Sequence, residues 1–328
     1  MKTSLSLFPS VFMTTIHFAN VYKQYSNAPR PAVDGVDFEV AEGSFVVLLG
    51  PSGCGKTTLL KMVNRLIEPT SGTIWLGGQD IRQVEPVQLR RQIGYVIQQI
   101  GLFPHMSVAQ NVAVVPSLLG WEPERIRQRV DALLELVDLP PDEYRERYPA
   151  QMSGGQRQRV GVARALAGDP GLILMDEPFG AVDAITRTGL QNALLDLQRK
   201  LKKTILFVTH DVEEALRLAD RIVVMRAGKV VQYDAPFDLL RRPADEFVHA
   251  LIGADDIVRQ LSMLRVAAAM EPIPPHFQPD GHPTVSCDEN LRQALSLLLR
   301  TDQHALIVLE QDKPIGLLTL RGIQLTAG

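Results

Sequence analysis

Residues 50–57 read Gly50-Pro51-Ser52-Gly53-Cys54-Gly55-Lys56-Thr57, and they are the most informative stretch of the chain for its fold. It matches the pattern Gly-x-x-x-x-Gly-Lys-Ser/Thr, in which glycine N–H groups curl around phosphate oxygens, the lysine adds a positive charge and the last hydroxyl reaches Mg²⁺. The apolar run 45–49 precedes it, and helix-forming residues beginning at Thr58 follow. Because the pattern requires strand, loop and helix in this order, it predicts a nucleoside triphosphate site in an α/β domain.

Composition sets broad limits on the class of protein. The chain has 328 residues, enough for two domains, and its net charge of −3 gives no general attraction to nucleic acid, so we expect no such partner. Cys54 and Cys287 form no Cys-x-x-Cys pair, which argues against a disulfide framework or a zinc site and fits a reducing cytoplasm. No run approaches the roughly 20 apolar residues that cross a bilayer.

Apolar strand-like segments alternate with helix-like ones, which predicts an α/β sheet domain over residues 14–253. Residues 1–13 are expected to be a flexible extension rather than a signal peptide, because Pro9 interrupts their apolar stretch. Helical spacing over 123–137 indicates a helical subdomain at about 99–165. The expected strands of the sheet are 45–49, 93–97, 172–175, 205–209 and 222–225.

The C-terminal quarter has a different character. Five prolines crowd residues 271–283, and this density predicts a linker over 254–282. A compact pattern then follows in 283–328: a strand, a helix and two further strands, with no tandem second copy. We therefore expect a small α+β unit after the sheet domain.

Two acidic residues complement the phosphate loop. Asp176 and Glu177 come directly after the expected strand 172–175. In this position Asp176 is expected to hold Mg²⁺, directly or through water, and Glu177 to polarise the attacking water. Adjacent surface acids are the alternative, which the presence of the phosphate loop disfavours.

Ser153-Gly154-Gly155-Gln156 opens the helix-like run 157–167, so its hydroxyl and amides face anions at a positive helix end. With the other motifs, this stretch resembles the ATP-binding subunits of ABC transporters over residues 15–251. In that family the corresponding LSGGQ motif of one subunit completes the ATP site of the other, which implies a homodimer. Met152 departs from the usual leucine, and Gly180 from the serine of Ser-Ala-Leu-Asp.

The resemblance assigns further residues by position. Tyr25 matches the aromatic that stacks on adenine, Gln98 the glutamine that touches Mg²⁺ and water, and His210 the histidine at the γ-phosphate. Ordinary readings stay open: Tyr25 as a half-buried tyrosine, His210 as a surface histidine, and Gln99 in place of Gln98. The implied sets are Lys56, Gln98, Glu177 and His210 for catalysis; Tyr25 and 50–58 for ATP; Thr57, Gln98 and Asp176 for Mg²⁺; and Ser153, Gly154, Gly155, Gln156 and Asp183 for contacts with the partner subunit's ATP.

The likeness also reaches the transported solute. Residues 64–72 and 93–105 look like those of bacterial uptake ATPases for glycine betaine, choline, carnitine and related osmoprotectants. This implies a peripheral subunit on the cytoplasmic face of the bacterial inner membrane, with separate permease subunits and, indirectly, a substrate-binding protein that sets specificity. The segment after Gln98 resembles the one that grips the permease, and its apolar contacts, or alternatively subdomain core, are Leu102, Phe103 and Met106.

Residues 266–272 and the unit 283–328 are similar to one cystathionine-β-synthase-type (CBS) repeat. Such repeats work in pairs, so a single copy is expected to find its mate on another subunit or to pack on the ATPase domain. Acids outnumber bases over 255–312, which argues against a cationic membrane-sensing surface.

Three rival functions remain at the level of sequence. One is an importer ATPase for another small solute such as an amino acid. A second is a soluble ABC-type ATPase of DNA repair or translation, although repair proteins insert long coiled coils where this chain has about fifty residues and translation factors usually carry two nucleotide domains. The third is a nucleotide-binding regulator whose C-terminal unit is the functional part.

Overall fold

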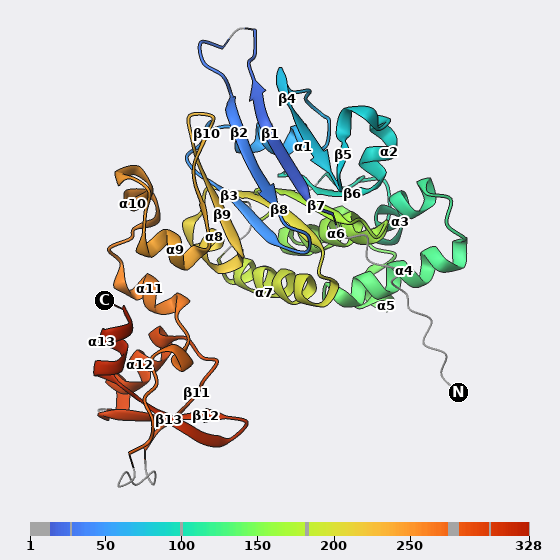
Figure 1. Ribbon diagram of the computed structural model, residues 1–328. Helices are drawn as coiled ribbons and strands as arrows, with labels where there is room; N and C mark the ends of the chain where they lie inside the picture. The colour runs from blue at the N-terminus through green and yellow to red at the C-terminus, as the bar shows by residue number, and fades with distance from the viewer. Residues whose placement is uncertain are drawn as a thin grey trace. The chain divides into compact units, whose positions relative to one another are not determined.

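The computed structural model describes residues 14–26, 28–98, 101–180, 184–274, 282–301 and 303–327. The chain divides into two compact units, Met1–Ala235 and Pro236–Gly328, and each is considered by itself (Figure 1). The boundary between the two units therefore lies earlier in the chain than the expected domain end at residue 253. No helix of the described residues is long and apolar enough to cross a membrane.

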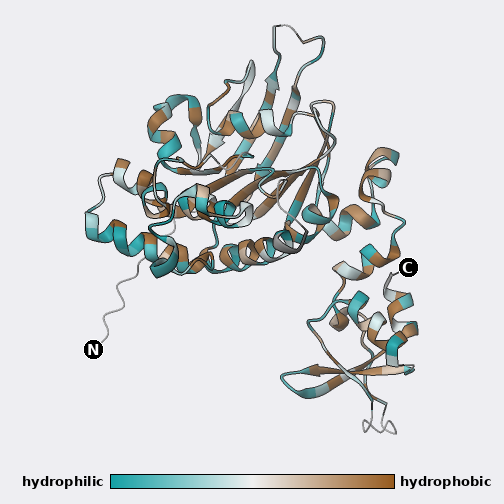
Figure 2. Ribbon diagram, turned by 180° about the vertical axis from the view of Figure 1, so that it is seen from behind, coloured by the Kyte–Doolittle hydropathy of each residue, from teal (hydrophilic) through white to brown (hydrophobic). Residues whose placement is uncertain are grey.

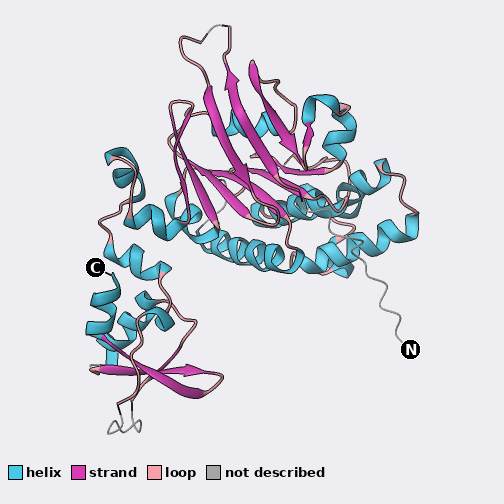
Figure 3. Ribbon diagram, viewed as in Figure 1, coloured by secondary structure: helices cyan, strands magenta, loops and turns pink. Residues whose placement is uncertain are grey.

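A six-stranded sheet forms the centre of the first unit, in the order β10-β9-β3-β8-β7-β6 (Figure 3). Strands β9, β3, β8, β7 and β6 are parallel, and β10 pairs antiparallel with β9. Its central strands are buried throughout and strongly apolar, as sheets covered on both faces require (Figure 2). The bounds are β3 Phe45–Leu49, β6 Ile93–Val96, β7 Leu172–Asp176, β8 Thr204–Thr209, β9 Arg221–Arg226 and β10 Lys229–Asp234.

A second, antiparallel sheet has the order β2-β1-β4-β5. Its apolar face shares one core cluster with α1 and with alternate residues of β3 and β8, such as Leu48 and Val208. Phe18 stacks on Phe38 inside this cluster, with ring centroids 4.5 Å apart. The core therefore fixes helix α1 between the two sheets. The bounds are β1 Ile16–Lys23, β2 Val33–Val40, β4 Ser71–Leu76, β5 Gln79–Asp80 and α1 Lys56–Val63.

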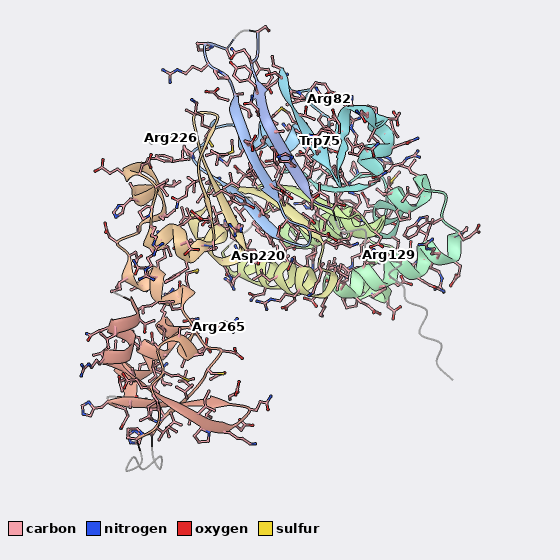
Figure 4. All side chains as sticks on the ribbon, in the orientation of Figure 1. Trp75, Arg82, Arg129, Asp220, Arg226 and Arg265 are labelled. Atoms are coloured by element: carbon pink, nitrogen blue, oxygen red, sulfur yellow. The ribbon has the colours of Figure 1, made fainter. Side chains whose placement is uncertain are left out.

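Helices fill the region between β6 and β7, where the sequence analysis placed a helical subdomain at about 99–165. Ser107 begins α3 with a capping box to Gln110, and Pro123 occupies the first turn of α4. Arg129 of α4, labelled in Figure 4, is 2% exposed and donates to the Leu166 carbonyl at the end of α6. The bounds are α3 Val108–Leu118, α4 Pro123–Leu136, α5 Pro141–Tyr144, η2 Pro149–Gln151 and α6 Gly154–Ala167.

The remaining helices of the first unit pack near the sheet. Helix α7 contacts α6 and α8, and α8 contacts β3. The Asp220 side chain, which follows α8 in the chain, accepts from the Phe45 N–H at 2.8 Å (Figure 4). This bond ties the start of β3 to the end of α8. The bounds are η1 Ile81–Gln83, α2 Pro86–Arg91, α7 Ala184–Leu201 and α8 Val212–Leu218.

The second unit contains a three-stranded sheet in the order β11-β12-β13, parallel and then antiparallel. Helix α11 and the turn η3 form inside the expected linker 254–282. They are stabilised there because Leu261 and Val266 pack into the apolar core of this unit. Part of that segment is therefore structured. The bounds are α9 Pro236–Arg241, α10 Glu246–Ile252, α11 Ile257–Met263, η3 Val266–Ala268, β11 Thr284–Ser286, α12 Leu291–Thr301, β12 Ala305–Glu310, β13 Lys313–Thr319 and α13 Leu320–Ala327.

Candidate nucleotide site

The phosphate loop joins β3 to α1, and two of its glycines have neighbours that exclude a side chain. Gly50 has φ 151°, and a Cβ there would lie 2.3 Å from the Met225 carbonyl oxygen. Gly55 has φ 109°, and a Cβ there would lie 2.2 Å from the Ala32 carbonyl oxygen. The loop therefore curls tightly between β9 and the segment that leads into β2, with α1 starting at its end.

Lys56 is buried within this loop. Its Nζ donates to the Gly50 carbonyl at 2.7 Å and to the Pro51 carbonyl at 3.0 Å. An ammonium carries three donors, and the two bonds to loop carbonyls fix the position of the group inside the loop. The Cys54 sulfur accepts the third donor of the same Nζ at 3.8 Å, and this cysteine is itself buried in the core cluster beneath the loop.

Thr57 and Asp176 meet across the site. The Thr57 hydroxyl donates to Asp176 Oδ1 at 2.8 Å, from the first turn of α1 to the carboxyl end of β7. Burial raises the pKa of the Asp176 carboxyl above its usual 3.8, against the opposing effects of the Thr57 hydrogen bond and of Lys61. The protein thus holds a desolvated carboxylate beside a hydroxyl, and a cation compensates such a group well.

These oxygens suit Mg²⁺. A hard cation prefers carboxylate and hydroxyl oxygens and takes few protein ligands when substrate phosphates supply the others. The described residues contain no cluster of three or more His, Cys, Asp or Glu side chains placed to hold a metal.

Glu177 follows Asp176, at the point where β7 ends. Its backbone has φ 44°, a left-handed conformation that costs free energy for a residue with a side chain. Its N–H donates to the Val208 carbonyl on β8 at 3.0 Å, and its own carbonyl accepts from Gly180 at 3.2 Å. These bonds to the neighbouring strand and turn hold the strained residue in place.

Two further predicted residues meet at the Glu177 carboxylate. Gln98 Nε2 donates to Glu177 Oε2 at 3.3 Å, and His210 Nδ1 lies 3.2 Å from the same oxygen. The three side chains come from the ends of β6, β7 and β8, the edge of a parallel sheet where ligands gather. Since Gln98 gives its amide hydrogen to Glu177, its Oε1 remains an acceptor for water or a cation. The arrangement can hold and polarise a water molecule.

Ser153 caps α6 through a capping box. Its Oγ accepts from the Gln156 N–H at 3.2 Å, and the Gln156 side chain accepts from the Ser153 N–H at 2.9 Å. Gln156 also donates to the Tyr144 hydroxyl at 3.0 Å. Among the described residues these bonds stay within the helical region and none reaches the phosphate loop. A Cβ at Gly154 would meet nothing within 4 Å, so this helix end is open to a ligand.

The other predicted residues have different outcomes. Tyr25 lies after β1, 40% exposed, with Lys23 Nζ 5.2 Å from its ring centroid. Part of its ring is therefore accessible for stacking. Tyr25 and Ala32 belong to the same β1–β2 connection, and Ala32 lies beside Gly55 of the phosphate loop. Asp183 and the alternative Gln99 lie outside the described residues.

The segment after Gln98 borders a cavity of about 360 Å³. Phe103 lines it and is 39% exposed, whereas Leu102 and Met106 are half-buried. Arg164 of α6 also lines it and donates to the Gly101 carbonyl at 2.7 Å, and burial lowers the pKa of this guanidinium. The apolar residues of the segment therefore contribute partly to the fold and partly to an accessible wall.

Sequence reasoning missed the residues behind His210. Thr209 and Glu214 are buried side chains that hydrogen-bond to each other, and burial raises the pKa of the Glu214 carboxyl. The only signal in the sequence was a glutamate five residues beyond a threonine at a strand end. A solvent-facing first turn of a helix gives the same signal, so the pattern alone does not identify a buried pair.

Comparison with known proteins agrees with this geometry. Residues 33–180 match the family described as ABC transporter. The chain is 50% identical over 293 residues to the Bacillus subtilis glycine betaine/carnitine/choline transport ATP-binding protein OpuCA, covering 89% of this chain and 74% of the relative. It is 46% identical over 314 residues to the Escherichia coli glycine betaine uptake system ATP-binding protein YehX, covering 95% and 100%.

A solved structure shares the fold. The ATP-binding cassette MJ0796, described as dimeric, in a post-hydrolysis state and bound to ADP and Pi, is 32% identical with a TM-score of 0.61, covering 67% of this chain and 98% of that one. The two sheets, the phosphate loop and the inserted helices define an ATP-hydrolysing P-loop protein. The chain belongs to the ABC transporter family and is an ATP-binding member of it.

Proposed function

We propose that this chain is the ATP-hydrolysing subunit of an importer for osmoprotectants of the quaternary-amine type, such as glycine betaine, choline and carnitine. The observation that carries the proposal is identity of 46–50% over about nine-tenths of the chain to relatives named for these solutes. The complete set of Lys56, Asp176, Glu177 and His210 supports hydrolysis by this chain itself.

The site residues divide into three roles. Residues 50–58 hold the phosphates, with Lys56 as the fixed positive charge, and Tyr25 offers its ring to adenine. Thr57, Asp176 and Gln98 would hold Mg²⁺, which when bound neutralises phosphate charge. Glu177 orients and polarises the attacking water, and His210 lies beside it to contact the transferred phosphate.

The site is completed by a second copy of the chain. The positively polarised N-terminus of α6 is formed by Ser153, Gly154, Gly155 and Gln156. The capping bonds within this terminus leave the space beside Gly154 open. Facing a partner's phosphate loop, these groups would close the γ-phosphate between two subunits, together with Asp183. Hydrolysis then removes the bridging phosphate and lets the subunits separate.

Membrane partners would supply the pathway for the solute. The accessible wall formed by Phe103 and the cavity beside it offers an apolar contact for a permease subunit on the cytoplasmic face of the bacterial inner membrane. Because the solute need not touch this chain, its selection belongs to a separate binding protein. Residues 283–328, whose strand, helix, strand, strand order fits one CBS-like repeat, form an additional unit of the same subunit.

Solute uptake in cells tests the proposal. The chain is expressed with its permease and binding protein in bacteria that lack other quaternary-amine uptake, and accumulation of radiolabelled glycine betaine is measured after an increase in osmolarity. Glu177→Gln serves as the control because it keeps the side-chain volume while weakening water activation. Uptake that depends on the wild-type chain supports the proposal, and equal uptake with Glu177→Gln contradicts it.

A further inference from the structure

A buried hydrogen-bond relay lies directly behind His210. Thr209 ends β8 and is 2% exposed, and Glu214 lies in the first turns of α8 and is 5% exposed. The Thr209 hydroxyl donates to Glu214 Oε2 at 2.7 Å and accepts from the Asp211 N–H at 3.0 Å. A hydroxyl has one hydrogen, so its donation to Glu214 leaves a lone pair to receive the Asp211 N–H.

This relay fixes the backbone on both sides of His210. Thr209 is held from the strand, while Asp211 caps α8 by accepting from the N–H groups of Glu213 and Glu214 at 2.9 and 3.2 Å. The His210 side chain is 58% exposed, so packing constrains its ring little. The direction of the imidazole toward Glu177 Oε2 therefore depends chiefly on the backbone that the relay holds.

Helix α7 contacts the same relay. Gln191 Nε2 donates to Glu214 Oε1 at 3.4 Å, and Arg187 Nη1 lies 3.4 Å from Asp211 Oδ2. Arg187 Nε is 3.9 Å from Glu214 Oε1. Helix α7 begins at Ala184, one residue after Asp183, the predicted contact with the partner subunit. The relay thus links His210 to the helix that follows the predicted subunit contact.

We propose that Thr209 and Glu214 are positioning residues for hydrolysis, which hold His210 against Glu177 and tie its placement to α7. Neither side chain reaches the reacting atoms; both act through the peptide that carries His210. The rival explanation is that the bond stabilises the end of β8 and nothing more. The two explanations differ in whether breaking it lowers turnover beyond any loss of stability.

The same strand offers a matched control. Thr204 starts β8, is fully buried and accepts from the Gly43 N–H at 2.9 Å. It lies about 16 Å from Thr209 along the strand. Thr204→Val and Thr209→Val each remove one threonine hydroxyl from β8, but only the second affects the connection to His210.

The test uses the full-length chain with saturating Mg²⁺ and ATP, and compares kcat, KM for ATP and Tm. We expect Thr209→Val to lower kcat about tenfold or more, with KM within about twofold of wild type, whereas Thr204→Val keeps kcat within about twofold. Thr209→Ser, which restores the hydroxyl, recovers most of the turnover. We expect Glu214→Ala to lower kcat as much as Thr209→Val does. Glu214→Gln keeps an acceptor for the Thr209 hydroxyl, so we expect it to lower kcat less.

Turnover relative to the Thr204 variant decides the matter. A kcat of Thr209→Val less than about a fifth of that of Thr204→Val, rescued by serine, supports the proposal; a smaller difference, or no rescue, overturns it. The experiment requires only ATP hydrolysis by this chain, so its result is independent of which solute the transporter carries.

Discussion

Two glycines of the phosphate loop allow the geometry of the ATP site to be tested quantitatively. Gly53 has φ 78° and a Cβ added there would meet nothing within 4 Å. Gly55 has φ 109° and the same addition would place Cβ 2.2 Å from the Ala32 carbonyl oxygen. Alanine at Gly53 therefore pays only for its backbone conformation, whereas alanine at Gly55 must also displace a backbone oxygen.

The two costs lead to different losses of ATP affinity. A left-handed conformation costs an L-residue roughly 1–2 kcal/mol, which corresponds to about a 5- to 30-fold weaker affinity for Gly53→Ala. For Gly55→Ala, the carbon must retreat by about 1 Å to reach normal contact. Ala32 resists this movement because its N–H donates to the Lys23 carbonyl at 2.8 Å. We expect at least about a further tenfold loss.

Titration with a fluorescent ATP analogue in the presence of Mg²⁺ measures both affinities, and circular dichroism confirms that each variant is folded. Equal affinities for Gly53→Ala and Gly55→Ala would contradict this expectation, because the close approach of Ala32 would then have no energetic effect. Near-wild-type affinity for both would also refute the strained-loop account.

Three further substitutions have defined outcomes. Burial raises the pKa of Asp176, so the folded protein binds this proton more tightly than the unfolded chain and loses stability as pH rises from the unfolded to the folded pKa. Asp176→Asn, which cannot ionise, should therefore raise Tm at neutral pH and abolish ATP hydrolysis. Asp169→Asn leaves buried Arg129 and Lys203 without their shared carboxylate, at 3.6 and 2.9 Å, and should lower the free energy of unfolding in urea by about 3–5 kcal/mol. Glu177→Gln should form an ATP-dependent dimer in size-exclusion chromatography, and a persistent monomer would contradict the two-subunit site.

Much of the fold was predictable because its signals are local. The apolar runs of the six-stranded sheet predicted β3, β6, β7, β8 and β9 to within a residue or so at each end. Buried parallel strands give uninterrupted apolar stretches, and the phosphate loop fixes the order of strand and helix around it. The ABC-type α/β fold expected from these motifs is confirmed by the solved cassette structure.

Proline density misled the prediction at the C-terminal side. It suggested a linker over 254–282, yet α11 lies within that range because Leu261 packs into the core of the second unit. A short helix stabilised by long-range packing leaves little local signal. The assignment of one CBS-like repeat to 283–328 stays a prediction.

Within the site, residue types were predictable but their contacts were not. The motifs pointed to Gln98, Glu177 and His210, but not to the convergence of Gln98 and His210 on one carboxylate oxygen of Glu177. The role of Thr209 and Glu214 depends on the pairing of a strand end with the following helix, and the sequence carries no spacing rule that separates such a pair from exposed residues.

Coupling of ATP hydrolysis to the transported solute is the decisive property of an osmoprotectant importer. The chain is reconstituted with its permease in proteoliposomes, and ATP hydrolysis is measured with the binding protein added alone or saturated with glycine betaine. The proposed function predicts that the saturated binding protein stimulates hydrolysis and that labelled glycine betaine crosses the membrane only with active chain, not with Glu177→Gln. Hydrolysis and transport that are indifferent to glycine betaine, choline and carnitine would contradict it.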